Sequence, residues 1–248
     1  MPVSPENPPN MVSLFPVGHI KLLGRYLAGI RILSSWMGAD PGRVRELYRE
    51  FAQSRPFGGT FRPLRCTDHY KAAVLYTICR VIRPRVVVET GVASGTSAVG
   101  ILSALERNSS GVLHSVDLPS AEYVTDSGVR WRDTGRPSGP GWIIPANLRS
   151  RWVLHLGSSW EMLPELLDKV GMIDLFYHDS EHTRATMDFE FNLALNHMSP
   201  LGGIAADNSN WSTSFPTFCA QNDLQPALLF PFLGLCRRKP NCAGARGD

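Results

Sequence analysis

From Pro84 onward this chain alternates short β-branched runs with helical patterns, and that alternation constrains the fold more than any other feature. Strands that alternate with helices form crossover units, which build a parallel sheet covered by helices on both faces. The sequence therefore predicts an α/β protein with a Rossmann-like, doubly wound, mostly parallel sheet of seven strands and an antiparallel edge strand. The expected strands are 85–89, 112–117, 151–156, 173–178, 204–207, 228–230 and 233–237, and the expected helices between them are 96–106, 160–169 and 181–196.

The region before this alternation carries helical patterns. Apolar residues recur along one stripe of 20–36, and a second helix is expected to begin at Pro41 with Asp40 as its N-cap. A third helix is expected over 67–82, ended by Pro84. We expect three parts, namely an N-terminal helical extension at 1–66, one α/β domain at 67–240 and a disordered tail at 241–248.

Composition excludes several classes of protein. The 248 residues include 25 Lys and Arg against 22 Asp and Glu, without a basic stripe or tail that would bind nucleic acid. The longest apolar runs are far shorter than the roughly 20 residues of a membrane-spanning helix. The five cysteines form no C-x-x-C pair, which favours free thiols in the cytoplasm over disulfides or a zinc site. The proline-rich start is unlike a secretory signal, although the lack of acidic residues from Asn7 to Ala39 leaves a transit segment as an alternative.

The stretch Leu118–Pro145 interrupts the alternation. It is rich in Gly, Pro, Arg and Trp, and it follows the carboxyl end of the second strand, the edge where open α/β sheets bind ligands. Connections of this length without secondary structure are usually lids or binding loops. We expect a lid here, with a surface loop that takes no part in chemistry as the alternative.

The residues from Glu89 to Ser97 predict a cofactor site. They lead from a strand through a glycine turn into a helix, whose free N–H groups face a ligand, and Gly91 and Gly95 let the backbone approach it. The spacing E-x-G-x-x-x-G lacks the G-x-G-x-x-G of dinucleotide sites. Glu89 would repel a pyrophosphate but attract an ammonium or a sulfonium, so the turn favours S-adenosylmethionine over NAD.

Two further strand ends extend this prediction. Asp117 ends the second strand, where a carboxylate can accept hydrogen bonds from both ribose hydroxyls. After the third strand, the loop containing Ser158, Ser159 and Trp160 offers a hydroxyl and an aromatic ring to an adenine. The alternative for either serine is a helix N-cap.

A set of polar residues follows the fourth and fifth strands and predicts a metal site with a base. Asp179, Asp207 and Asn208 offer the oxygen ligands that suit Mg²⁺. His182, expected early in the next helix, can take a proton from a substrate hydroxyl on the metal, since imidazole titrates near neutral pH. Alternatives are helix caps for the aspartates, a surface role for His182, and a zinc or di-iron site through His178, which is disfavoured because His178 should point to the opposite face.

The block from Thr67 to Lys239 resembles the class I S-adenosylmethionine-dependent methyltransferases. Within them it is most similar to the small bacterial enzymes that include macrocin-type and other antibiotic-sugar O-methyltransferases, through E-T-G-V-x-S-G, L-G-S-S-x-x-x-L-P, D-L-F-Y-H-D-S-E-H and L-G-G-x-x-A-D-N. It resembles catechol O-methyltransferase more distantly. The resemblance implies the following roles: Glu89, Gly91 and Ser97 at the methionine end, Asp117 at the ribose, Ser159 and Trp160 at the adenine, Asp179 beside the cofactor, and Asp179, Asp207 and Asn208 at Mg²⁺.

Two positions bear on how this resemblance applies. The sugar enzymes have a histidine at the position of His182, where the catechol enzymes have a lysine, and this supports His182 as the base. The sugar enzymes often have a second Asp where this chain has Asn208, and the lost charge should weaken metal binding. In similar enzymes, segments like the one before Thr67 cover the active site or form subunit contacts, which leaves a homo-oligomer open.

The expected function is in-line transfer of a methyl group to a hydroxyl of a small-molecule acceptor, such as a sugar. Trp211 and the lid are the expected acceptor contacts, and Arg132 and Arg136 favour a polar or anionic acceptor such as a nucleotide-linked sugar. The alternatives are a metal-independent N- or O-methyltransferase, a non-catalytic cofactor-binding protein and, less favoured, a nicotinamide oxidoreductase.

Overall fold

The computed structural model describes residues 19–57, 67–119, 122–124, 130–132, 139–229 and 232–239. The expected N-terminal stretch before residue 19, the tail 241–248, Arg136 and much of the lid lie outside the described residues. The helices are α1 His19–Met37, α2 Pro41–Gln53, α3 Thr67–Ile82, α4 Thr96–Asn108, α5 Ser159–Val170, α6 Arg184–Asn196 and α7 Ser214–Gln221, with a 3₁₀ helix η2 at Ala146–Arg151. The strands are β1 Val86–Thr90, β2 Val112–Asp117, β3 Glu122–Val124, β4 Arg130–Arg132, β5 Trp152–Leu156, β6 Ile173–His178, β7 Met198–Ala206, β8 Leu224–Leu229 and β9 Leu233–Arg238.

Seven of these strands form one sheet in the order β5-β2-β1-β6-β7-β9-β8. Strands β5, β2, β1, β6 and β7 run parallel to one another, as crossover connections through helices require. β9 is antiparallel to both β7 and β8. The α/β prediction is thus confirmed, with the antiparallel strand one position inside the edge. β3 and β4 form a separate antiparallel pair within the expected lid.

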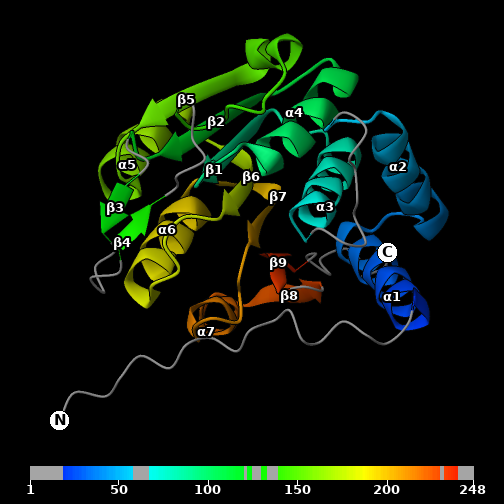
Figure 1. Ribbon diagram of the computed structural model, residues 1–248. Coiled ribbons are helices and arrows are strands. Elements are labelled where there is room, and N and C mark those ends of the chain that lie inside the picture. Colours follow the sequence, from blue (N-terminus) through cyan, green and yellow to red (C-terminus); the bar gives the residue numbers. More distant parts are fainter. Residues whose placement is uncertain are drawn as a thin grey trace, which may run out of the picture.

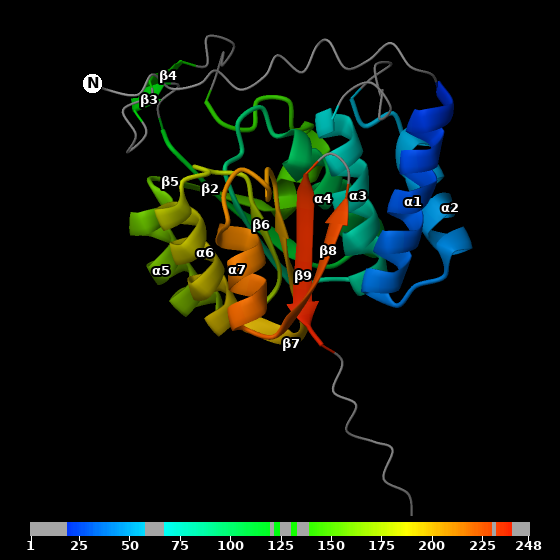
Figure 2. The ribbon, with the colours of Figure 1, turned by 90° about the horizontal axis from the view of Figure 1, so that it is seen from below.

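Helices cover both faces of the sheet (Figures 1 and 2). α5, α6 and α7 lie on one face, and their apolar side chains share a buried cluster with side chains of the sheet. α3 and α4 lie on the other face, with α1 and α2 outside them. The buried cluster on that side joins all four of these helices to the sheet, so the N-terminal helices contribute to the core.

α2 shows how local sequence attaches the N-terminal helices. Its N-cap Asp40 accepts a hydrogen bond from the Arg43 backbone N–H, and Pro41 begins the helix, as predicted. Residues at helical spacing form its buried face, and burying each large apolar side chain stabilises the fold by about 2 kcal/mol. These residues are Val44, Leu47, Tyr48 and Phe51.

Three local predictions were wrong. α6 begins at Arg184 with Thr183 as its N-cap, so His182 lies in the loop before the helix and not in its first turn. The expected strand 204–207 begins earlier, because residues 200–203, whose Pro and Gly are typical of a turn, belong to β7 as a bulge, where the register jumps from Ile173↔Met198 to Leu175↔Gly203. The helix α7 was not predicted at all, because its eight residues are too few to show a clear period.

The described helices include no candidate for a membrane span. None of them combines the length and the apolar character that a membrane span needs.

Candidate active site

The carboxyl ends of four neighbouring strands meet at one edge of the sheet. Thr90 at the end of β1 pairs with Val116 of β2 and with His178 of β6, and His178 pairs with Ala206 of β7. The residues that follow continue this contact, since the backbone N–H of Asp179 donates to the Thr90 carbonyl and that of Asp207 to the His178 carbonyl, each at 2.8 Å. This edge therefore gathers the strand-end residues that were predicted from the sequence.

Gly91, which follows β1, lies in close contact with the backbone of Asp179, which follows β6. Its φ is +81°, and a Cβ at this position would lie 2.0 Å from the carbonyl oxygen of Asp179. No side chain could occupy that space without moving the β6 end of the site. Gly95, with φ +98°, is the N-cap of α4 and supplies no side-chain hydrogen bond to it. The turn thus presents a helix N-terminus without a side-chain cap beside the strand ends.

Glu89 lies below this turn and is fully buried. Its two carboxylate oxygens accept hydrogen bonds from the hydroxyls of Ser97, at 2.5 Å, and Ser115, at 2.7 Å. The structure thus joins the predicted residues Glu89 and Ser97, and it adds Ser115, which in turn accepts a hydrogen bond from the Trp152 indole. Burial, together with the nearby Asp117 charge, raises the pKa of Glu89 to about 7 against the opposing effect of the two serine hydroxyls.

This pKa predicts how stability depends on pH. Glu89 ordinarily titrates near 4.5, so between about pH 4.5 and pH 7 the folded state binds a proton that the unfolded state has lost. The free energy of unfolding should therefore fall as pH rises through this window, by up to about 3 kcal/mol from this one group. Replacing Glu89 by Gln should remove that part of the slope. Urea unfolding of both proteins at pH 5 and pH 8 measures it.

The matched control is Glu165→Gln on the exposed side of α5, which should leave the slope as it is. A Glu89→Gln protein whose stability falls between pH 5 and pH 8 as steeply as that of the wild type would contradict the prediction.

Asp117 holds the glycine turn from the neighbouring strand. Its Oδ2 accepts hydrogen bonds from the backbone N–H groups of Val92, at 3.1 Å, and Ala93, at 2.9 Å, and its Oδ1 accepts one from Leu118. Ala93 has φ +46°, a conformation in which a backbone N–H can turn toward a strand-end carboxylate. Asp117 therefore holds the backbone of the predicted cofactor turn in place, and this role was not predicted from the sequence.

The two serines that follow β5 have different roles. Ser158 is the N-cap of α5 and forms a capping box with Glu161. Ser159 is not used as the cap, and its side chain is among the groups that lower the pKa of Glu190 in α6. Trp160 stacks on Phe189 with ring centroids 4.0 Å apart, and its side chain remains 46% exposed. An exposed aromatic ring thus lies at this end of the predicted cofactor site.

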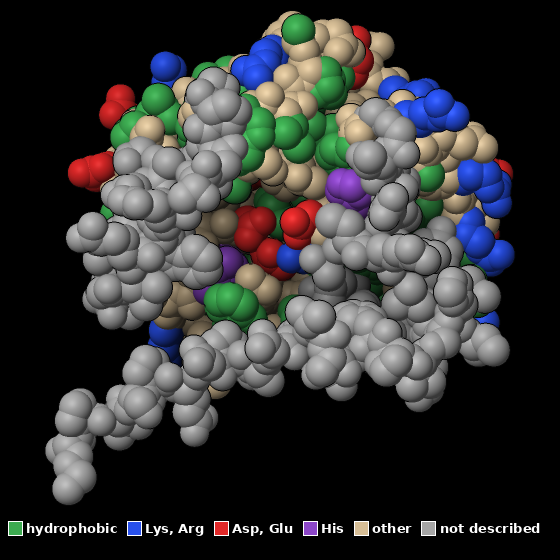
Figure 3. All heavy atoms as spheres, in the orientation of Figure 1, with side chains coloured by type: hydrophobic (Ala, Val, Ile, Leu, Met, Phe, Trp, Pro, Cys, Tyr) green, Lys and Arg blue, Asp and Glu red, His purple; other side chains and the backbone are tan. Residues whose placement is uncertain are grey.

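Asp179, His182 and Asp207 form a compact cluster after β6 and β7. Each offers one ligand atom, and these atoms lie within 4.8 Å of one another. The Nε2 of His182 lies 3.8 Å from Oδ1 of Asp179 and 3.4 Å from Nδ2 of Asn208. In Figure 3, acidic side chains gather at the floor of a hollow in this face, with a basic side chain among them. The predicted metal ligands and base are thus neighbours in space.

Two further residues of this cluster were not predicted from the sequence. Lys71, from α3, places its Nζ 2.5 Å from Oδ2 of Asp207, and the Tyr177 hydroxyl donates to Oδ2 of Asp179 at 3.1 Å. Lys71 did leave a signal, because it is a charged residue immediately before the apolar run 72–76 in a helix. A lysine so placed is either solvent-facing or paired, and only the structure supplies its partner.

Burial and neighbouring charge set the ionisation of this cluster. Burial, with a smaller contribution from the neighbouring His178, lowers the pKa of His182 to about 4, so the imidazole is neutral at pH 7. We expected it to titrate near neutral pH, and the difference arises from this desolvation. Burial and the adjacent Asp207 carboxylate raise the pKa of Asp179 well above its usual range, while Lys71 opposes that shift. The neutral His182 can accept a proton.

His178 is not among the ligand atoms of the cluster, although its ring centroid lies 5.2 Å from that of His182. Its Nδ1 lies 2.7 Å from Oε2 of Glu190, and this oxygen also accepts a hydrogen bond from the Thr90 hydroxyl. All three side chains are fully buried. His178 thus belongs to a buried network that joins α6 to the sheet, and the metal-ligand geometry groups His182 with the two aspartates instead.

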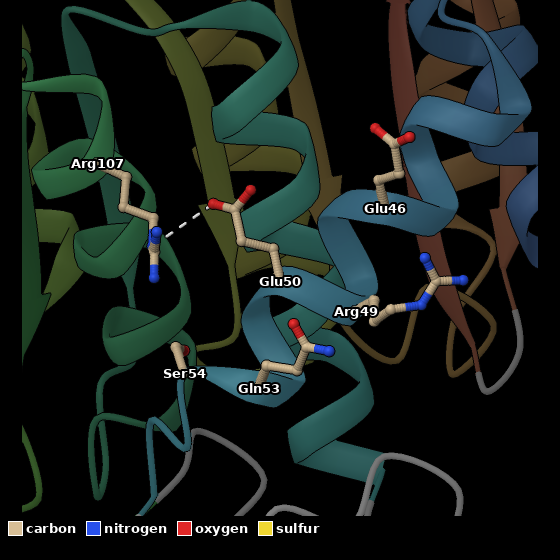
Figure 4. A pocket seen from close by; sticks show the side chains of 6 residues that line it. All are labelled: Glu46, Arg49, Glu50, Gln53, Ser54 and Arg107. Atoms are coloured by element: carbon tan, nitrogen blue, oxygen red, sulfur yellow. Dashed lines mark ion pairs between the residues drawn. The ribbon is translucent and has the colours of Figure 1, made fainter.

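A shallow pocket of about 390 Å³ lies elsewhere, between α2 and α4 (Figure 4). It is lined by side chains of both signs, and Arg107 lies 3.5 Å from Glu50 across it. Glu50 is also held by Arg80 and by the Tyr76 hydroxyl, so its charge is satisfied within the protein. This pocket shares no residue with the predicted site. Its lining residues are Glu46, Arg49, Glu50, Gln53, Ser54 and Arg107.

Known proteins share both a sequence family and the fold with this chain. Residues 88–209 match a family described as a methyltransferase domain. The O-methyltransferase from Bacillus cereus, solved in complex with SAH, is 16% identical, with 84% of this chain and 95% of that chain covered at a TM-score of 0.50. The calicheamicin methyltransferase is also 16% identical, with 85% and 91% covered at a TM-score of 0.51.

A third solved structure is the O-methyltransferase TomG from Streptomyces achromogenes, involved in tomaymycin synthesis and solved with SAM. It is 15% identical, with 80% of this chain and 89% of that chain covered at a TM-score of 0.50. No curated protein sequence matches the chain significantly. Residues 88–209 of this chain thus match a methyltransferase domain, and the chain shares its fold with O-methyltransferases that were solved with SAH or SAM.

Proposed function

We propose that this protein transfers a methyl group from S-adenosylmethionine to a hydroxyl of a small molecule, with a divalent cation as an aid. One observation carries the proposal: the cluster of Asp179, His182 and Asp207 adjoins the glycine turn so closely that a Cβ on Gly91 would meet the Asp179 carbonyl. The predicted cofactor turn and the predicted chemical groups are therefore parts of one site.

The residues of the turn fit an adenosyl cofactor, which would supply the electrophilic methyl group. Gly91 and the α4 N-terminus leave backbone groups for the methionine end, near the Glu89–Ser97 pair. Asp117 fixes the turn from β2, where its carboxylate can also accept ribose hydroxyls, and Ser159 with Trp160 lies at the expected adenine end. Because Glu89 and Ser97 hydrogen-bond each other, we propose that they support the methionine subsite as a pair.

The donor set also fits a divalent cation. Asp179, Asp207 and Asn208 offer hard oxygen atoms, and the two neighbouring carboxylates together attract positive charge. We propose these three residues as its ligands. A cation bound there would lower the pKa of an acceptor hydroxyl.

His182 is the proposed base. It is neutral at physiological pH because of its burial, so it can accept the proton that an acceptor hydroxyl loses. Asn208 lies 3.4 Å from its Nε2, which fixes the orientation of the ring, and Trp211 packs beside it with ring centroids 5.2 Å apart. Trp211 is 59% exposed, and we propose its indole as a surface on which the acceptor lies.

The acceptor is proposed to be a natural product or a sugar unit of one. Two proteins that share this fold are described as a calicheamicin methyltransferase and as an O-methyltransferase involved in tomaymycin synthesis. A polar acceptor suits the hollow in which acidic side chains gather (Figure 3), and the exposed Trp211 indole lies beside His182. The absence of a nucleic-acid partner, the homo-oligomer and the cytoplasmic location stay predictions.

Calorimetric titration with S-adenosylhomocysteine, with NAD as the control ligand, tests the cofactor. We expect micromolar binding of the adenosyl ligand both with Mg²⁺ and with excess chelator, and none of NAD. Labelled S-adenosylmethionine with a panel of hydroxyl and amine acceptors then tests the transfer. Transfer to amines alone, or transfer that a chelator leaves unchanged, supports the metal-independent N- or O-methyltransferase. Cofactor binding without any transfer supports the binding protein, and no binding at all rejects the proposal.

A further inference from the structure

Lys71 is a buried lysine whose charge the proposed reaction does not use. It lies in α3, on the face that packs against the sheet, and its side chain is only 11% exposed. A buried ammonium is costly unless it is paired, and Lys71 meets this requirement through Oδ2 of Asp207 at 2.5 Å. The partner is one of the two carboxylates proposed to bind a divalent cation.

Both carboxylate oxygens of Asp207 already have a hydrogen-bond partner. Oδ1 of Asp207 accepts the backbone N–H of Asn208 at 2.7 Å, while Oδ2 is occupied by Lys71. Oδ2 of Asp179 accepts the Tyr177 hydroxyl. Lys71 also acts on Asp179 through charge, since it is among the groups that hold down the pKa of that carboxyl.

The charges of the cluster can therefore be compared directly. Asp179 and Asp207 carry two negative charges when ionised, and Lys71 brings one positive charge into contact with them. A divalent cation that bound Asp207 would approach the Lys71 ammonium within a few ångströms. In a partly buried site that repulsion is strong, because the local dielectric screens it poorly.

We propose that Lys71 is the resident cation of the Asp179–Asp207 pair and that it opposes divalent-cation binding, so that the site takes Mg²⁺ only weakly. This inference rests on the proposed function, because it assumes that the pair is the place where a divalent cation would bind. It gives Lys71 a positioning role: the ammonium holds the Asp207 carboxylate and neutralises part of its charge while no metal is bound.

The test is calorimetric titration of the full chain with MgCl₂ alone. Lys71→Gln removes the charge but keeps a hydrogen-bond donor for Asp207, and we expect it to bind Mg²⁺ about tenfold more tightly than the wild type, or better. Lys71→Arg keeps the charge and should bind Mg²⁺ as weakly as the wild type. Lys169→Met removes an exposed lysine of α5 and should change nothing.

Folding and cofactor binding are measured on the same samples by circular dichroism and by titration with S-adenosylhomocysteine. If Lys71→Gln does not fold, Lys71→Met and Lys71→Arg provide the same comparison of an uncharged with a charged residue. Equal or weaker Mg²⁺ binding by the uncharged variants would overturn the inference, as would the absence of millimolar binding in all of them. A wild-type protein that did not bind S-adenosylhomocysteine would instead reject the proposed function, so the two failures are distinct.

Discussion

Gly91→Ala should abolish cofactor binding and destabilise the protein by more than about 3 kcal/mol. The new Cβ would lie 2.0 Å from the Asp179 carbonyl oxygen, and φ at this position is +81°, which alanine adopts only at a cost. Relief of the clash requires that the ends of β1 and β6 move apart, which would break the hydrogen bond from the Asp179 N–H to the Thr90 carbonyl. Urea unfolding and titration with S-adenosylhomocysteine measure the two effects.

Gly38→Ala is the matched control for the backbone conformation. Gly38 also has a positive φ, +68°, but a Cβ there would meet nothing within 4 Å. It should cost about 1 kcal/mol and leave cofactor binding intact. If both variants lost the same small amount of stability and both bound the adenosyl ligand normally, close contact between the cofactor turn and the β6 end would not be needed.

The sequence predicted the fold well because its local patterns and its tertiary structure agree. The glycine turn after β1 and the Asp40–Pro41 start of α2 are determined by neighbouring residues, and both occur where expected. The position of β9 was less predictable: both neighbours of this strand are antiparallel to it, and the order of strands in a sheet depends on contacts between distant residues.

Predictions failed where tertiary packing overrides local signals. Pro200, Gly202 and Gly203 indicate a turn, yet the chain passes through them as a bulge in β7 that carries Leu201 into solvent. His182 was expected within a helix over 181–196, but Thr183 is the N-cap and the helix begins at Arg184. The loop position is what brings the imidazole beside Asp179 and Asn208.

Some residues of the candidate site could likewise be predicted from the sequence, and others could not. Residues that directly follow strand ends, such as Asp117, Asp179 and Asp207, could be placed together because parallel strands end at one edge. Lys71 could not, since 136 residues separate it from Asp207 and no pattern along the chain relates the two. Ser115 was likewise hidden within β2, although its hydroxyl holds Glu89 from the neighbouring strand. A site's supporting contacts are therefore harder to predict than its strand-end groups.

His182→Ala should lower the rate of methyl transfer by about 10²- to 10⁴-fold, the usual contribution of a positioned general base. The imidazole is neutral at pH 7 and lies beside the carboxylates proposed to orient the acceptor, and no other histidine joins that group of ligand atoms among the described residues. The affinity for S-adenosylhomocysteine should stay unchanged, because the cofactor contacts are assigned to other residues. Single-turnover rates with saturating labelled cofactor, and with the acceptor found in the panel, separate transfer from binding.

His197→Ala is the matched control, since this histidine ends α6 and lies 3.7 Å from Asp168, away from the strand-end cluster. It should leave the transfer rate as it is. His182→Gln tests the base more sharply, because glutamine keeps a hydrogen-bonding group for Asn208 but cannot take a proton at neutral pH. If glutamine restored the rate that alanine lost, the role of His182 would be to orient its neighbours, and the proton would have to leave through another group. A loss with both substitutions, at unchanged cofactor affinity, requires that the imidazole itself accepts the proton.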